Sequence, residues 1–186
     1  STTIAPTVKN VANVGEALPP ALCARFFDRC EGQVQWWNLW GPTECTTYAT
    51  VHEVRPSDAT QSRISIGRPC RYRSVYVLDD ALQPVAVDIP GELYVGGPGV
   101  AKGYRNRPDM TAGSFVTWNG EDGVEEILYR TGDIGRWRHN GALDFLGRSD
   151  FQVKIRGLRI ELGEIESVMS QVAGVRDVVA VVHQQS

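Results

Sequence analysis

A run of aromatic and apolar residues ends in the segment Asn38-Leu39-Trp40-Gly41-Pro42-Thr43-Glu44. Trp40 offers a face for stacking, Thr43 a hydroxyl for a phosphate oxygen, and Glu44 an oxygen ligand of the kind that magnesium prefers. Loops that follow strands at the edge of an open α/β sheet are common ligand sites. The same residues fit an ordinary turn around a buried Trp at least as well, so this segment alone leaves both interpretations open.

Two further segments carry polar groups at the ends of short strands. Asp133 closes the sequence Tyr-Arg-Thr-Gly-Asp, where its carboxylate can accept both hydroxyls of a ribose or simply form a turn. Residues 147–166 are dense in charge for a hairpin that joins a helix, which also fits a solvated edge. The glycine-rich stretch 95–99 lacks the spacing of a dinucleotide fingerprint or a P-loop, so it predicts a turn region.

The composition indicates a globular protein. Of the 186 residues, 42% are hydrophobic and 22% are charged, and the net charge of −3 gives no reason to expect nucleic acid or an anionic membrane as a partner. The chain has no apolar run of the length that spans a bilayer. Its four cysteines form no C-x-x-C pair, which favours reduced thiols in a cytoplasmic protein. Without a starting Met or a signal pattern, the chain reads as an interior segment.

The first part of the chain predicts strand, helix and strand. An apolar segment over residues 8–18 meets Pro19-Pro20, which suits a helix entrance because proline's missing N–H costs nothing in the first turn. The helix should stop near Gly32, and residues 33–40 read as the second strand. This order predicts a mostly parallel α/β layer.

From about residue 63 short strands follow one another, at 74–78, 91–95 and 127–129. Residues 135–146 form the clearest hairpin, since Asn140-Gly141 suits a type I′ turn. This pattern predicts an antiparallel sheet or a distorted barrel.

The last part of the chain predicts a hairpin over residues 151–160 that turns near Arg156-Gly157, then a helix over 161–173 that stops at Gly174, then a strand over 175–182. We therefore expect two parts. Residues 1–149 form an α/β layer to about residue 60 and then mainly β structure. Residues 150–186 start a smaller α+β part, which we expect to be truncated.

Four ordered segments together resemble the core motifs of the adenylate-forming superfamily, which includes acyl-CoA synthetases and luciferases. They are N-L-W-G-P-T-E at 38–44, G-E-L-Y-V-G-G-P-G-V-A-K-G-Y at 91–104, Y-R-T-G-D at 129–133, and G-R-S-D-F-Q-V-K-I-R-G-L-R-I-E-L-G-E-I-E at 147–166. The sequence of residues 152–157 is typical of the adenylation domains of non-ribosomal peptide synthetases rather than of CoA ligases. The resemblance implies the C-terminal part of the large adenylate-forming core, followed by the start of the small subdomain.

The resemblance also implies roles for single residues. The residues that it implies contact the nucleotide are Gly15, Glu16, Asn38, Leu39, Trp40, Gly41, Pro42, Thr43, Asp133 and Arg148. Trp40 stands where a Tyr is common and keeps the stacking face, while Asp133 binds the ribose hydroxyls. Glu44 holds the metal, and Thr43, Glu44 and Lys154 serve catalysis. Asp150 matches the hinge between the subdomains. The amino-acid pocket falls to Ala12, Val14, Leu39, Thr47 and Tyr48, none of which is charged, so the resemblance implies a neutral substrate.

The implied reaction joins an amino acid to ATP with Mg²⁺ and expels pyrophosphate, and the acyl group then passes to the phosphopantetheine thiol of a carrier protein. Carrier and condensation domains of the same synthetase are the implied partners. The family's phosphate loop, its amine-binding Asp and its last lysine are not found in this sequence, so we expect this chain alone to be inactive. An acyl-CoA ligase of the same superfamily and a non-catalytic nucleotide-binding fragment remain as alternatives.

Overall fold

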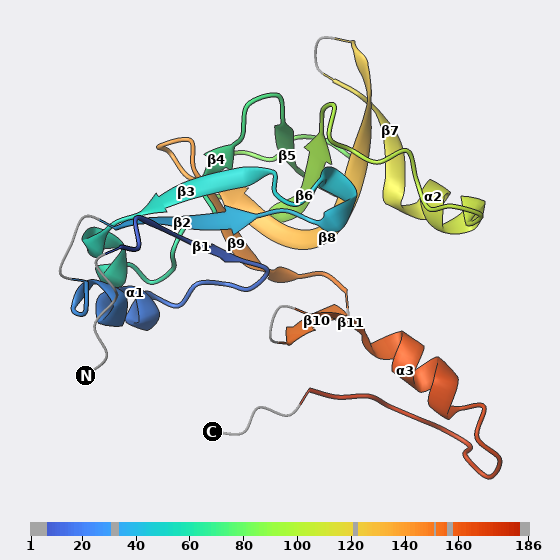
Figure 1. The fold of residues 1–186 in the computed structure, drawn as a ribbon. Coiled ribbons are helices and arrows are strands. Elements are labelled where there is room, and N and C mark those ends of the chain that lie inside the picture. The colour runs from blue at the N-terminus through green and yellow to red at the C-terminus, as the bar shows by residue number, and fades with distance from the viewer. Residues whose placement is uncertain (1–6, 31–33, 121–122, 151, 156–157, 183–186) are drawn as a thin grey trace.

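The computed structural model describes residues 7–30, 34–120, 123–150, 152–155 and 158–182. Figure 1 shows two sheets that pack together, with the elements after residue 150 set apart from them. One sheet has the order β1-β2-β3-β4, and the other has the order β5-β6-β8-β7 with β9 paired to β8. A separate hairpin, β10-β11, precedes helix α3. The mixture of α/β and antiparallel β structure confirms the predicted fold class.

The first sheet contains the predicted strand, helix and strand. These are β1 (Asn10–Val14), α1 (Pro20–Phe27) and β2 (Gln35–Trp40), and β1 pairs with β2 in parallel. The expected mostly parallel layer is wrong, because β3 (Thr50–Val54) and β4 (Arg68–Pro69) both pair antiparallel. The loop from β2 to β3 is short and reverses the chain, whereas a parallel connection needs a long crossover such as α1. Helix α1 ends at Phe27, earlier than predicted, and Gly32 lies outside the described residues.

The second sheet is antiparallel, as predicted for residues 61–149. Its strands are β5 (Ser74–Leu78), β6 (Gly91–Gly96), β7 (Phe115–Asn119), β8 (Glu125–Trp137) and β9 (Leu143–Arg148). Strand β8 is much longer than the expected strand at 127–129. A short helix, α2 (Pro108–Ser114), and the 3-10 helices η1 (Thr43–Cys45) and η2 (Pro56–Thr60) were not predicted from the sequence.

The turn between β8 and β9 differs from the predicted type I′ geometry. The Gly141 N–H donates to the carbonyl of Arg138, and Gly141 alone among turn residues 138–142 has a positive φ, of 74°. A type I′ turn needs positive φ at both central residues. The chain instead turns over His139 and Asn140, and Gly141 follows in the left-handed region. Residues 139–141 therefore form a three-residue hairpin loop.

The region after residue 150 differs most from the prediction. The hairpin of β10 (Gln152–Ile155) and β11 (Leu158–Glu161) is confirmed, although its turn at Arg156-Gly157 lies outside the described residues. Helix α3 covers Leu162–Met169 rather than 161–173, because the chain tightens into i→i+3 hydrogen bonds from Gln171 onward. Residues 175–182 form no strand and pair with none of the strands in the described part of the chain, so that prediction is wrong.

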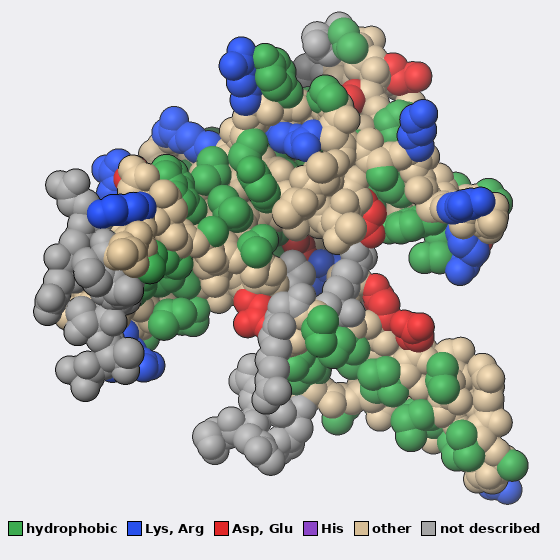
Figure 2. All heavy atoms as spheres, in the orientation of Figure 1, with side chains coloured by type: hydrophobic (Ala, Val, Ile, Leu, Met, Phe, Trp, Pro, Cys, Tyr) green, Lys and Arg blue, Asp and Glu red, His purple; other side chains and the backbone are tan. Residues whose placement is uncertain are grey.

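Among the described residues, three apolar clusters hold the elements together. The largest lies between the two sheets and includes Trp40, Leu93, Tyr129 and Leu143. A second cluster packs α1 on the first sheet around Trp36, and a third lies around Trp118. By contrast, the apolar face of α3 is exposed, as Figure 2 shows. The exposed fraction of Ile165, Val168 and Met169 is at least 41% for each residue. No helix in the described ranges is long and apolar enough to cross a membrane.

Candidate functional site

The site begins at the carboxyl ends of the parallel pair β1 and β2. Val14 lies opposite Leu39 in the register, so the loops that start at Gly15 and at Gly41 leave the sheet at the same edge. This is the edge at which open α/β sheets bind ligands. The sequence placed the candidate residues 15–16 and 38–44 on these two segments, and the structure brings them side by side.

Opposite this edge, β8 and β9 present an aspartate and an arginine. Asp133 and Arg148 are cross-strand partners, and the Arg148 guanidinium donates a hydrogen bond to Asp133 Oδ1. The Trp40 indole N–H donates to Asp133 Oδ2 at 2.7 Å. Asp133 is 3% exposed, so these bonds hold its carboxylate in one orientation. A carboxylate has about four lone-pair positions, so Asp133 can accept hydrogen bonds from a ligand in addition to those from Trp40 and Arg148.

Arg148 also binds the predicted hinge residue. Its Nε and Nη2 atoms donate to the two carboxylate oxygens of Asp150, each at 2.7 Å. Gly132 makes this approach possible, because its φ is +72° and a Cβ there would lie 2.6 Å from both Arg148 Nη2 and Asp150 Oδ2. The register shift in β8 next to Asp133 helps to aim these side chains.

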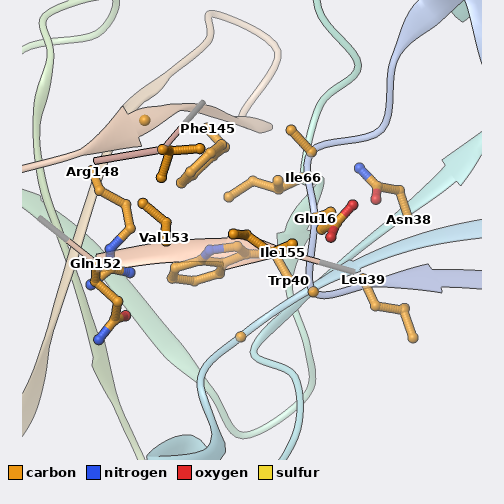
Figure 3. A pocket seen from close by; sticks show the side chains of 15 residues that line it. Glu16, Asn38, Leu39, Trp40, Ile66, Phe145, Arg148, Gln152, Val153 and Ile155 are labelled. Atoms are coloured by element: carbon orange, nitrogen blue, oxygen red, sulfur yellow. The ribbon is translucent and has the colours of Figure 1, made fainter. Parts of the chain in front are cut away.

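A cavity of about 460 Å³ lies between the sheet edge and the hairpin β10-β11. Figure 3 shows Trp40 beside Val153 and Ile155, with Arg148 and Gln152 at one side and Glu16 and Asn38 at the other. The Asn38 side chain is buried and fixed, since it donates to the Ser65 carbonyl at 2.8 Å. The predicted residues that line this cavity are Gly15, Glu16, Asn38, Leu39, Trp40, Gly41 and Arg148. Its mixed walls, an aromatic face and apolar side chains with polar groups at each end, suit a planar base.

An adjoining cavity of about 330 Å³ contains the polar part of the site. It shares Gly15, Gly41, Arg148 and Gln152 with the first cavity. The predicted residues that line it are Val14, Gly15, Gly41, Pro42, Thr43, Thr47, Asp133 and Arg148. Thr131, Thr46 and Gln152 also line it, and sequence reasoning missed all three. Gln152 is 5% exposed, and its Oε1 atom has no hydrogen-bond partner among the residues that the structure describes.

The predicted amino-acid pocket is divided in the structure. Ala12, Leu39, Thr47 and Tyr48 line one hollow of about 860 Å³, whereas Val14 lines the polar cavity instead. Arg71 and Arg73 also line this hollow, so it contains cations that the five predicted positions do not. Both arginines have other contacts: the Arg71 guanidinium lies 4.7 Å from the Tyr72 ring, and the Arg73 guanidinium packs against Gly99.

Glu44 faces a different set of residues. Its Oε1 accepts a hydrogen bond of 2.6 Å from the Tyr104 hydroxyl. Burial and this bond raise the pKa of Tyr104, which therefore stays protonated and acts as a donor. Burial likewise raises the pKa of the neighbouring Cys45 to about 12, so this thiol is no nucleophile at neutral pH. Lys154 lies in β10, and its side chain is outside the described residues.

The side chains around Glu44 fit magnesium better than a cation whose ligands all come from protein side chains. Across the described ranges, no group of three or more His, Cys, Asp or Glu side chains gathers in one place. Magnesium is commonly held by one or two carboxylates together with substrate phosphates, and it keeps several waters. A single carboxylate at Glu44, oriented by the Tyr104 hydroxyl, matches that pattern.

The parallel strand ends, the base-sized cavity and the buried Asp133–Arg148 pair define a nucleotide-binding protein of the adenylate-forming type. The family described as AMP-binding enzyme matches residues 2–105, which is more than half of the chain, and the chain belongs to this family.

Curated relatives of this chain are large synthases and synthetases. The chain is 44% identical over 172 residues to tyrocidine synthase 3 of Brevibacillus parabrevis, covering 92% of this chain and 3% of that protein. It is 44% identical over 173 residues to phosphinothricin tripeptide synthetase PhsB of Streptomyces viridochromogenes, covering 93% of this chain and 14% of that protein. The chain thus spans a small part of the relatives that it matches.

Solved structures of adenylation domains have the same fold. PA1221, described as a peptide synthetase protein containing adenylation and carrier (PCP) domains, matches with a TM-score of 0.86 at 33% identity, over 95% of this chain and 36% of that chain. The Vibrio cholerae adenylation domain AlmE in complex with glycyl-adenosine-5'-phosphate matches with a TM-score of 0.82 at 32% identity, over 94% of this chain and 32% of that chain. This chain is similar to about a third of each of those chains.

Proposed function

We propose that this chain is the part of an amino-acid adenylation domain that binds the nucleotide of ATP and forms one wall of the amino-acid pocket. The observation that carries the proposal is the buried carboxylate of Asp133, which Trp40 and Arg148 hold in the polar cavity that adjoins the base-sized one. The solved structure of AlmE with glycyl-adenosine-5'-phosphate supports this assignment, because that protein holds an aminoacyl adenylate and shares the fold.

In this proposal, Trp40 and the loop at Gly15 and Glu16 enclose the base, and Asp133 accepts hydrogen bonds from the ribose hydroxyls. Because Asp133 is held in place before the nucleotide arrives, it loses little freedom on binding. The Thr43 hydroxyl is exposed at the first position of η1, where it can donate to an α-phosphate oxygen.

The reaction is the attack of an amino-acid carboxylate on the α-phosphorus of ATP, with loss of pyrophosphate. The chain's residues contribute positioning and charge rather than a covalent step. Magnesium bound at Glu44 would neutralise charge on the phosphates. We assign Lys154 to the same phosphates, and Asp150 to the hinge about which residues from 150 onward turn before the acyl group is transferred.

The partner that receives the acyl group is a carrier protein with a phosphopantetheine thiol, as the adenylation and carrier domains named in PA1221 support. We place a condensation domain next in the same synthetase. The cytoplasm is the proposed location, in keeping with four cysteines that are all free thiols.

We propose a neutral amino acid as the substrate. Ala12, Val14, Leu39, Thr47 and Tyr48 carry no charge, and a lone substrate charge buried against them would be costly. Arg71 and Arg73 line the same hollow as four of these residues, so an acidic side chain is the alternative substrate that the test must include.

The test is ATP–pyrophosphate exchange by the full-length protein with a panel of amino acids. We expect neutral amino acids to stimulate exchange, and Thr43→Val to lower it by roughly tenfold, the loss of one hydrogen bond to a charged group. Thr60→Val is the matched control, since Thr60 is also an exposed threonine in a 3-10 helix and should leave exchange unchanged. Preference for Asp, Glu, Lys or Arg would contradict the neutral pocket. Activity with CoA and no amino acid would contradict the function itself.

A further inference from the structure

The motif at residues 91–104 lines neither of the two cavities beside Asp133, but its second half runs alongside the loop after β2. Three hydrogen bonds join the two segments. The Ala101 N–H donates to the Glu44 carbonyl at 2.8 Å, the Thr46 hydroxyl donates to the Gly99 carbonyl at 2.8 Å, and the Tyr104 hydroxyl donates to the Glu44 carboxylate at 2.6 Å. The motif therefore contacts both the backbone and the side chain of the proposed metal ligand.

The loop that it contacts has a strained backbone. Thr46 and Thr47 have positive φ values of 58° and 73°. The Tyr48 N–H donates to the Thr46 carbonyl at 3.0 Å, which closes a three-residue turn around Thr47. A turn of this kind with positive φ is rare and strained, and such conformations persist only where surrounding contacts fix them. The hydrogen bonds at Gly99 and Ala101 are contacts of that kind.

Tyr104 is itself held from two sides. Its ring packs edge-on against Phe115, with ring centroids 5.6 Å apart, and its backbone N–H donates to the Thr111 hydroxyl at 2.9 Å. The hydroxyl of the buried Tyr129 lies 3.4 Å from the Tyr104 hydroxyl. The phenol is thus fixed in position before it meets Glu44, and its single O–H is directed at Oε1.

We propose that Tyr104 is a positioning residue that orients the Glu44 carboxylate for a divalent cation, and that residues 97–104 support the strained loop that carries it. This inference rests on the proposed function, in which Glu44 is the metal ligand. Hydrogen bonds to a ligating carboxylate fix its orientation, and loss of such a partner typically weakens metal binding by about 10–100-fold.

The experiment compares Tyr104→Phe with Tyr76→Phe in the full-length protein. Tyr76 is a matched control, because its hydroxyl also donates to a glutamate, Glu126, at 3.0 Å, on the second sheet and outside the cavities at Asp133. Binding of Mn²⁺ to the protein in complex with α,β-methylene-ATP is measured by electron paramagnetic resonance. Binding of AMP without metal is measured by calorimetry and reports whether the nucleotide site is intact.

We expect Tyr104→Phe to weaken Mn²⁺ binding by about tenfold, the lower end of the range for a lost hydrogen bond to a ligand, and to leave AMP affinity unchanged. Tyr76→Phe should change neither. Unaltered Mn²⁺ affinity in Tyr104→Phe would overturn the inference, and so would an equal loss of AMP affinity, which would indicate a merely structural role. If the unsubstituted protein binds neither AMP nor the analogue, the proposed function fails and this inference fails with it.

Discussion

Replacing Asp133 by asparagine removes the negative charge of the site and keeps the shape of the side chain. Asparagine retains a carbonyl oxygen that can accept from Trp40, but it no longer pairs with the Arg148 guanidinium. Alanine would be a poorer choice, because it would leave both the indole N–H and the guanidinium without this partner in a buried place.

The expected effect on nucleotide binding follows from the bonds that the charge would make. Each hydrogen bond to a charged group contributes about 1.5–3 kcal/mol, roughly twice the value of a neutral one, so losing charge assistance at two ribose hydroxyls should cost about 1.5–3 kcal/mol. At tenfold for each 1.4 kcal/mol, the dissociation constant for AMP should rise by roughly 10- to 150-fold.

The substitution also affects stability. Breaking a buried ion pair costs about 3–5 kcal/mol when one charge is left alone. Arg148 keeps its bidentate contact with Asp150, so we expect a loss at or below the lower end of that range. Asp144→Asn is the matched control, because Asp144 is 1% exposed, lies on the same hairpin and pairs with Arg136 and Arg138.

Calorimetric titration with AMP and thermal unfolding of the full-length protein separate the two effects. Both variants should unfold at a lower temperature, whereas Asp133→Asn alone should lose AMP affinity. Unchanged affinity in Asp133→Asn would refute the role of this carboxylate. An equal loss in Asp144→Asn would show that the effect comes from the hairpin's stability and not from contact with the ribose.

Two further predictions concern the backbone and a buried thiol. Gly132→Ala should lower the unfolding temperature and weaken AMP binding, because alanine is strained at a φ of +72° and its Cβ would clash with the Arg148–Asp150 pair. An unchanged unfolding temperature and an unchanged AMP affinity would contradict the packing described at Gly132. The free energy of unfolding should fall as the pH rises from about 9 to about 12, because burial raises the pKa of Cys45 to about 12 and the unfolded thiol releases its proton near 9. In denaturant titrations, Cys45→Ala should lose less of its free energy of unfolding over this pH range than the unsubstituted protein. The same pH dependence in both proteins would contradict this prediction.

The fold could be predicted where local pattern and packing agree. The strand, helix and strand at the start follow from apolar runs and from Pro19-Pro20, and the hairpins follow from alternation and turn residues. Strand β8 exceeds its predicted length because Gly132 and Gly135 interrupt the apolar alternation, although its backbone pairs with β7, β6 and β9 in turn along its length. The valine-rich residues 175–182 have strand propensity, but a strand also needs a partner to complete its hydrogen bonds.

The site was predictable only in part, and for a similar reason. The segments at 38–44 and 129–133 carry recognisable chemistry in their own sequence, and the cavities contain most of the residues named there. Tyr104 and Gln152 could not be identified in this way, since their contacts depend on packing. Tyr104 reaches Glu44 across 60 positions of sequence. Its aromatic ring in a glycine-rich turn was the one available signal.

A crystal structure of the full-length protein with AMP bound tests the central claim most directly. The account predicts the base in the cavity of about 460 Å³ against Trp40 and the loop at Gly15 and Glu16. It predicts both ribose hydroxyls within hydrogen-bond distance of the Asp133 carboxylate, with Arg148 still paired to it. AMP bound elsewhere on the protein, or in this cavity with its ribose directed away from Asp133, would contradict the account.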